Sequence, residues 1–496
     1  PSRRKLKLPG VPKSKGCDGC IKVKKGCDLL KPSCSRCTRI GLPCTGTNSK
    51  RYKFLHVHLQ PHEHRIPVTE SRFLPVAFIR DPLSLMPTNS TTRTASAFVA
   101  RLEVHDVRYD ISAYGGFLKY LPPRLGVNRS LDAAMDAFSA VFSNYNGEPY
   151  SLAVFRKYVN AISAVRDCVS RPNKDTIVET ICAIYLLMLV QAWMGRQNDG
   201  LVSHEEGLAY LLDVTANNGC RNEFDTLVFA VIAIPVVYAS MTNSRINLGP
   251  AFWSIMQRLA PPKQPIPGPL DEEMALADQA GTFPSLHFQN LGKLPSFLRE
   301  PESHYGEILY IYGMVQRDIP RFEAKLAEMP ILLSQLDTSN AKTRRDMQSA
   351  YAMALAMAVV LNQILEAFGH FSFKWSKDCN NFIKKIIDVA EEASRFRPIG
   401  AGFMVGSLSI AWAATAEPKL KRQLQNLKDE FFKSFKGENW ENMATWWFYK
   451  YMEIRFRLGR PRPGDDYEKA MRESAKFVSC VQCAASHNYI ENPIHT

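Results

Sequence analysis

The chain has 496 residues, of which 46% are hydrophobic and 22% are charged. This length exceeds that of one ordinary domain, and this composition excludes a chain that is disordered throughout. The formal net charge is +14, an excess that favours polyanionic partners.

The N-terminal segment PSRRKLKLPG is basic and has no apolar run behind it, so we expect no secretory signal peptide. The longest apolar stretches, residues 181–194 and 227–241, fall short of the roughly 18 residues that span a bilayer, and the second contains Pro235. We therefore expect both stretches to be buried helices of a soluble protein without a membrane partner.

Nearly all of the excess positive charge lies at the start of the chain. Residues 1–53 contain 15 Lys or Arg and only two acids, Asp18 and Asp28, whereas the rest of the chain contains 47 Lys or Arg and 46 acids. Such a patch attracts nucleic acid above all. A basic tail that serves only solubility or nuclear import is the alternative that the charge alone leaves open.

Six of the 12 cysteines lie within residues 17–44. They repeat one pattern, C-x2-C-x6-C, over Cys17, Cys20 and Cys27 and again over Cys34, Cys37 and Cys44. A C-x2-C pair can direct both sulfurs at one metal ion, and thiolates at such spacing suit tetrahedral Zn²⁺. Three thiolates leave each ion one ligand short, and two shared sulfurs complete both tetrahedra. We therefore expect two structural zinc ions in a bridged six-cysteine cluster.

The charge of this cluster is compatible with DNA binding. Six thiolates and two Zn²⁺ sum to −2, so residues 1–53 keep a net charge of about +11 with both ions bound. A basic module that is folded by metal, without an apolar core, suits docking on DNA. The alternative is a disulfide knot, against which the expected lack of a signal peptide and the six cysteines elsewhere both argue.

Residues 17–44 resemble the DNA-binding module of fungal zinc binuclear cluster transcription factors. Besides the cysteine spacing, the features that match are Asp28 after the third cysteine, the segment KPSCSRC (Lys31 to Cys37) and Gly41 before the last cysteine. The resemblance implies that a short helix after Cys20 places its end in the DNA major groove. Members of the family typically recognise CGG-type triplets.

The resemblance also implies a division of the six ligands. Cys17 and Cys34 would bridge the two ions. Cys20 and Cys27 would complete one zinc site, and Cys37 and Cys44 the other.

Base contacts in the family come from basic residues three and four positions after the second cysteine, which are Val23 and Lys24 here. Lys24 can donate to N7 and O6 of guanine. Val23 departs from the family pattern, as do Ile21 and Gly26, and these departures leave the preferred triplet open. Other basic side chains are expected to contact phosphates, which position the module without conferring specificity, or to be solvated surface; they are Lys22, Lys25, Lys31, Arg36 and Arg39.

Residues 47–104 are expected to form a linker. Within it Leu55, Val57 and Leu59 alternate with histidines and predict a short strand. Four histidines lie in or near this segment: His56, His58, His62 and His64. A metal site is one interpretation of them, and a polar surface is the simpler one. The segment has no sustained heptad pattern, so a coiled-coil dimer is not expected, while a homodimer of another kind stays open.

From about residue 105 the hydrophobic pattern becomes helical. In residues 128–142, Ser130 is the expected N-cap, and apolar residues follow on one face. Similar patterns predict helices at about 152–165, 174–194, 201–214, 224–241, 347–368, 380–395, 400–415 and 440–456. The predicted fold is thus a small zinc-organised N-terminal DNA-binding module followed by a large all-α domain, residues 105–460.

This helical region is similar to the regulatory domain, of the middle homology type, that follows the cluster in many such factors. The similarity lies in residues 114–138, the apolar helix at 177–194 and HEEGLAYLL at 204–212. It implies regulation by a small-molecule effector or a co-regulator. The aromatic segment at 440–451 would suit a pocket, but core packing is the simpler interpretation.

The sequence contains no G-x-x-x-x-G-K-[ST], G-x-S-x-G, H-E-x-x-H or G-x-G-x-x-G motif, so we expect no catalytic residue and no enzyme. Four residues near the end of the sequence have spacing that would also suit a metal site: Cys480, Cys483, His487 and His495. An ordinary helix face is the simpler interpretation of this segment. Small core residues are expected at Cys168, Cys182, Cys220 and Cys379.

These features predict a nuclear, sequence-specific regulator of RNA polymerase II genes whose partner is double-stranded DNA. The expected organisation is a basic tail (1–15), the zinc cluster (16–46), the linker (47–104), the helical domain (105–460) and a C-terminal tail (461–496). One alternative is an interaction protein that keeps the cluster without recognising DNA, which Val23 and Gly26 favour. The other is an enzyme with its active site in the helical domain.

Overall fold

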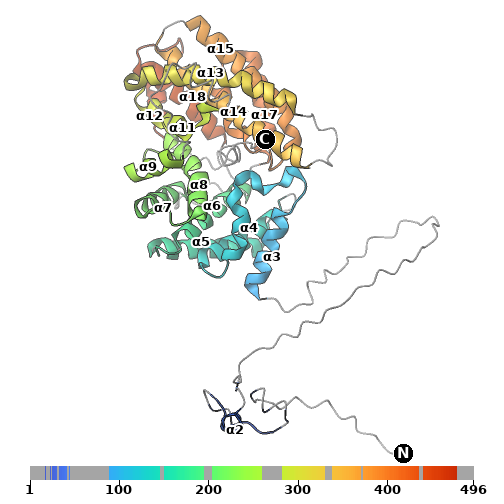
Figure 1. The fold of residues 1–496 in the computed structure, drawn as a ribbon. Coiled ribbons are helices and arrows are strands. Elements are labelled where there is room, and N and C mark those ends of the chain that lie inside the picture. The colour runs from blue at the N-terminus through green and yellow to red at the C-terminus, as the bar shows by residue number, and fades with distance from the viewer. Residues whose placement is uncertain are drawn as a thin grey trace, which may run out of the picture. The chain divides into compact units, whose positions relative to one another are not determined.

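The computed structural model divides the chain into two compact units, Pro1–Asp81 and Pro82–Thr496 (Figure 1). In the first unit it describes Cys17, Cys20, Val23, residues 25–28, Leu30, residues 33–41 and Cys44. In the second unit it describes residues 89–145, 150–171, 173–194, 204–259, 282–329, 338–369, 372–434 and 440–476.

Every regular element among these residues is a helix, which confirms the predicted fold class. The first unit contains α2 (Ser35–Arg39). The second contains α3 (Ser90–Leu102), α4 (Arg129–Ser143), α5 (Leu152–Ser170), α6 (Ile177–Met194), α7 (His204–Asn218), α8 (Glu223–Thr242), α9 (Pro250–Leu259), α11 (Phe288–Leu291), α12 (Leu294–Arg299), α13 (Tyr305–Glu328), α14 (Thr338–Ala367), α15 (Ser372–Ala393), α16 (Met404–Ala414), α17 (Pro418–Phe432), α18 (Trp440–Arg457) and α19 (Tyr467–Ser474). Short 3-10 helices are η2 (Val107–Tyr109), η3 (Ile111–Tyr114), η4 (Gly116–Tyr120), η5 (Pro122–Arg124), η6 (Pro284–Leu286), η7 (Pro301–His304) and η8 (Ser394–Phe396).

The helices of the second unit pack as two neighbouring groups, which Figure 1 shows in blue to green and in yellow to red. In the first group α4 packs against α3, α5 and α6, and α7 packs against α6, α8 and α9. In the second group α14 contacts α13, α15, α16 and α18. The 30-residue helix α14 is therefore the centre of the C-terminal group.

Three helices are long and apolar enough to cross a membrane by length and composition: α6, α8 and the Ser339–Ala367 part of α14. The expectation that no segment reaches this length is therefore wrong, because each helix continues beyond the apolar run that the sequence displays. In the helical unit, the buried share of the apolar window is 94% for α6, 78% for α8 and 94% for α14. Their side chains form much of the core.

The second unit has helices outside the predicted range 105–460. Helix α3 begins after Asn89, whose side chain accepts a hydrogen bond from the Thr92 amide at 2.7 Å. Its Phe98 packs on Phe138 of α4, with ring centroids 5.5 Å apart. At the other end α19 packs against α18. The domain boundaries themselves stay predictions.

The N-cap of α4 is Asn128, so the prediction of Ser130 is wrong. The Asn128 side chain accepts hydrogen bonds from the amides of Ser130 and Leu131, and it donates to Thr180 Oγ1 at 2.9 Å. A buried asparagine can cap this helix and bind α6 with the same amide group. The serine hydroxyl instead donates to Asn128.

A buried ionic cluster joins the start of the helical unit to α14. The Arg345 guanidinium donates to Asp110 at 2.8 Å and to Asp346 at 2.7 Å, and Lys342 Nζ lies 3.2 Å from the Asp110 carboxylate. Both Asp110 and Arg345 are buried. Because charges removed from water need partners, this cluster fixes η3 against the central helix.

The cysteines and aromatic residues of the helical unit divide between core and partly covered positions. Cys182 and Cys379 are buried, as predicted, whereas Cys168 and Cys220 are half-buried. The aromatic segment at 440–451 contributes Trp446, Trp447 and Tyr451 to the core, which confirms the simpler interpretation of that segment.

Candidate metal centre

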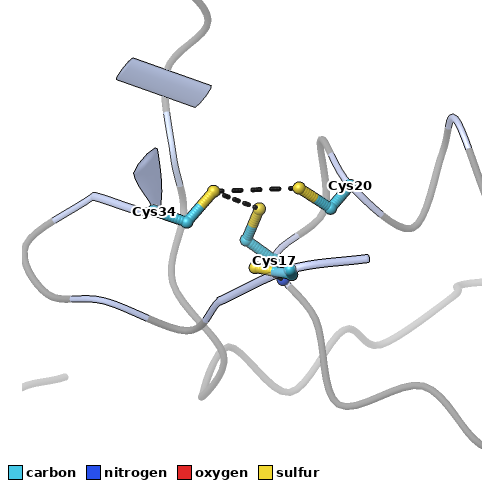
Figure 2. A group of neighbouring side chains, drawn as sticks. Cys17, Cys20 and Cys34 are labelled. Atoms are coloured by element: carbon cyan, nitrogen blue, oxygen red, sulfur yellow. Dashed lines mark hydrogen bonds between the residues drawn. The ribbon is translucent and has the colours of Figure 1, made fainter. Parts of the chain in front are cut away.

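The six cysteine sulfurs of the first unit come together although their residues span positions 17–44. Cys34 Sγ lies 3.6 Å from Cys17 Sγ and 3.7 Å from Cys20 Sγ. Figure 2 shows the sulfurs of these three residues close together. Cys17 Sγ lies 3.5 Å from Cys37 Sγ. Tetrahedral Zn²⁺ with Zn–S bonds of about 2.3 Å separates its sulfurs by about 3.8 Å. The sulfurs therefore have the spacing that zinc requires.

Two groups of four sulfurs are present, and they share two members. One group is Cys17, Cys20, Cys27 and Cys34, and the other is Cys17, Cys34, Cys37 and Cys44. Within each group the sulfurs all lie within 4.8 Å of one another. Two tetrahedral sites that share Cys17 and Cys34 account for this arrangement with six ligands.

The backbone repeats itself in the two halves of the cluster. The Cys17 amide donates to Cys27 Sγ at 3.5 Å, and the Cys34 amide, 17 positions later, donates to Cys44 Sγ at 3.4 Å. An amide donor stabilises a thiolate, because it places a positive dipole beside the negative sulfur. The repeated spacing in the sequence is thus a repeated structure.

Helix α2 positions two of the ligands. Cys34 is its N-cap, and Cys34 Sγ accepts a hydrogen bond from the Cys37 amide at 3.4 Å. The Asp28 carboxylate accepts a further hydrogen bond from the Ser35 amide at 3.2 Å. Asp28, which the sequence marks only as a match to the family pattern, therefore has a structural role at the start of α2.

The six cysteine sulfurs need a nearby cation if they are to be ionised. Burial and the neighbouring Cys17 and Cys34 thiols raise the pKa of Cys20 to about 12. Ionisation of the Cys20 thiol without a nearby cation is therefore disfavoured, and two Zn²⁺ would offset the negative charge of the six thiolates. Zinc would supply the fixed tetrahedral crosslinks of this unit.

The core of the first unit, among its described residues, consists of the cysteines themselves. No larger apolar cluster is described there to hold the chain together. Metal ligation would therefore contribute most of the folding free energy of this unit.

The described residues include four of the seven predicted DNA contacts. Val23 and Lys25 are exposed, Arg36 is half-buried, and Arg39 is exposed in the last turn of α2. Lys22, Lys24 and Lys31 lie outside the described residues, as do both groups of histidines and cysteines that the sequence raised as further metal sites. Elsewhere in the described chain, no second set of side chains with metal-ligand spacing occurs.

Comparison with known proteins identifies this unit. The family model of the fungal Zn(2)-Cys(6) binuclear cluster domain matches residues 15–53. Neither the curated proteins nor the solved structures contain a match to the chain. The matched segment includes all six cysteines and the two sulfur groups described above. Residues 15–53 are therefore a fungal Zn(2)-Cys(6) binuclear cluster domain, a two-zinc module of DNA-binding transcription regulators.

Proposed function

We propose that this protein is a nuclear, sequence-specific regulator of RNA polymerase II transcription. Its zinc cluster enters the DNA major groove, and its helical unit regulates its activity. The observation that carries the proposal is the pair of four-sulfur groups that share Cys17 and Cys34, in the one strongly basic part of the sequence.

The two sulfur groups support an assignment of the ligands. Cys17 and Cys34 belong to both, so they bridge the ions. Cys20 and Cys27 complete one site, and Cys37 and Cys44 complete the other. The six side chains hold the backbone rigid, so basic side chains between them are presented on a fixed frame.

The charge distribution assigns DNA binding to the first unit. Residues 1–53 contain 15 Lys or Arg and two acids, while the remainder of the chain is nearly neutral. Lys25 and Arg39 are exposed and suit phosphate contacts, with Lys22, Lys31 and Arg36 in the same role. Lys24 would donate to guanine in the major groove.

We assign the regulatory role to the helical unit. It has its own extensive core, built around α6, α8 and α14. Its near-neutral charge adds little to non-specific DNA binding. We assign to it the binding of a small-molecule effector or a co-regulator, and no catalytic activity.

A second candidate function is an interaction module that keeps the zinc cluster and does not recognise DNA. Exposed aliphatic side chains on the first unit favour it, because Leu30 is 59% exposed and both Val23 and Ile40 are 46% exposed. Such side chains suit a protein surface as well as a base edge.

Selection of bound sites from random double-stranded DNA tests the proposal. The full-length wild-type protein should select one site and bind it more tightly than scrambled DNA. Lys24→Ala should weaken the selected site by roughly 1–3 kcal/mol and scrambled DNA much less. Lys22→Ala and Lys25→Ala are the matched controls, and each should weaken both DNAs alike and reduce the salt slope by about one unit.

Two outcomes would count against this assignment. If Lys25→Ala causes the specific loss instead of Lys24→Ala, the base contact is shifted by one position. If wild type does not distinguish the selected and scrambled DNAs, the interaction module is the better interpretation.

A further inference from the structure

Val23 and Ile40 occupy equivalent positions in the two halves of the zinc cluster. Each residue of the first half corresponds to the residue 17 positions later in the second half. Cys17 thus corresponds to Cys34, and Val23 corresponds to Ile40. The two β-branched side chains have the same exposed fraction, 46%. The internal repeat thus presents an aliphatic side chain to solvent at the same place in each half.

Neither side chain takes part in the described core of the unit, which consists of cysteines. The Lys25 amide donates to the Cys20 carbonyl at 3.0 Å, and this turn leaves Val23 between them at the surface. An exposed valine contributes nothing to ligation, and it gains nothing from a charged phosphate. Its chemistry instead fits an apolar group on a partner.

Charge distinguishes the two halves. Residues 21–25, with the sequence IKVKK, contain three lysines around Val23, whereas the equivalent residues 38–42, TRIGL, contain only Arg39. A polyanion is attracted more strongly to the first segment. Val23 is therefore the aliphatic side chain on the half that attracts a polyanion more strongly, and Ile40 is its equivalent on the less basic half.

We propose that Val23 contacts the 5-methyl group of a pyrimidine in the major groove, so that this module prefers thymine at one position of its site. The proposal rests on the proposed DNA-binding function and assigns part of its specificity. The thymine methyl is the apolar group that unmodified bases present in the major groove. A neighbouring lysine can donate to guanine at the adjacent position, so the valine and the lysine would recognise different bases.

The test replaces thymine by deoxyuridine at each thymine of the site that full-length, zinc-loaded protein selects. This change removes only the 5-methyl group. At one position the affinity of wild type should fall about fourfold, the contribution of one buried methyl group. For Val23→Ala the same replacement should have no effect, and Ile40→Ala, the matched control, should respond like wild type.

A second variant tests the assignment by a gain of preference. Val23→Lys introduces a donor where the valine stands, so it should shift the preference at that position from thymine to guanine. A 5-methylcytosine at the same position should bind wild type more tightly than cytosine, with the difference again lost in Val23→Ala.

The outcomes separate this inference from the function on which it rests. If a site is selected but no thymine-to-uracil change affects wild type, or if Ile40→Ala abolishes the effect and Val23→Ala does not, the inference is wrong and the DNA-binding function stands. If no site is selected at all, both are wrong.

Discussion

Among single residues, Cys17 and Cys34 differ from the other four ligands because each belongs to both groups of sulfurs. Replacement of either by Ala should therefore remove a ligand from both zinc ions, and the purified chain should retain almost no zinc. Replacement of Cys20 or Cys44 removes a ligand from one ion, and about one zinc per chain should remain. Elemental analysis after dialysis measures the difference. Equal zinc loss in Cys17→Ala and Cys20→Ala would show that the sulfurs are not shared.

The buried pair Asp110–Arg345 makes a prediction for stability. Asp110→Asn removes one of the two carboxylates that face the buried Arg345 guanidinium, while Asp346 keeps it paired, so the free energy of unfolding should fall by about 1.5–3 kcal/mol. Asp106→Asn is the control, because its ion pair with Arg108 is largely exposed and should contribute at most about 1 kcal/mol. Urea unfolding followed by circular dichroism measures both.

The same pair predicts a pH dependence. Burial by itself would raise the pKa of Asp110, but Arg345, Ser112 and Lys342 together lower it below its usual value. The carboxylate therefore stabilises the fold above the unfolded-state pKa of about 3.9, and this contribution is lost as the pH falls through the folded-state pKa. The stability difference between wild type and Asp110→Asn should be constant from about pH 7 to 5 and shrink below about pH 4. A difference that is unchanged in acid would refute the assignment.

Among the helices, α4 depends on a cap that also crosslinks it. The Asn128 side chain binds the amides at the start of α4, the Thr176 carbonyl and the Thr180 hydroxyl. Asn128→Ala should therefore cost about 2–4 kcal/mol, since it removes a cap and leaves buried polar groups unpaired. Asn89→Ala removes an exposed cap of α3 alone and should cost about 1 kcal/mol. Similar losses in the two variants, measured by urea unfolding, would mean that the contacts to α6 contribute little.

The elements that the sequence predicts well are those whose apolar residues repeat at helical spacing. Helix α13 was not predicted at all, although it is 24 residues long. It contains Pro320, which removes one helical hydrogen bond and is typical of a helix end. Its buried residues Ile311, Val315 and Phe322 lie on a helix that packs against α14. The helical spacing of these residues was therefore present in the sequence, and packing against α14 outweighs the cost of the internal proline.

The zinc site was predictable for a different reason. The ligands are close together in the sequence and are all of one residue type, so their spacing alone specifies the chemistry. The equivalence of Val23 and Ile40 follows from the same repeat, but their equal exposure is visible only in the structure. The hydrogen bond between the Asp28 carboxylate and the Ser35 amide also needed the structure, because it depends on where α2 begins.

In the molecule as a whole, metal, charge and core are distributed between two units. The first unit contains the sulfur groups and the basic excess, and the second contains the large apolar core. This division predicts that zinc controls DNA binding without controlling the fold of the helical unit.

Chelator titration of the full-length protein tests this account most directly, with zinc release, DNA binding and far-ultraviolet circular dichroism followed in the same sample. We expect two zinc ions to be released per chain, binding of the selected DNA site to be lost with them, and the helical signal to stay nearly unchanged. Release of one zinc or none, or DNA binding that persists after both ions are gone, would contradict the account.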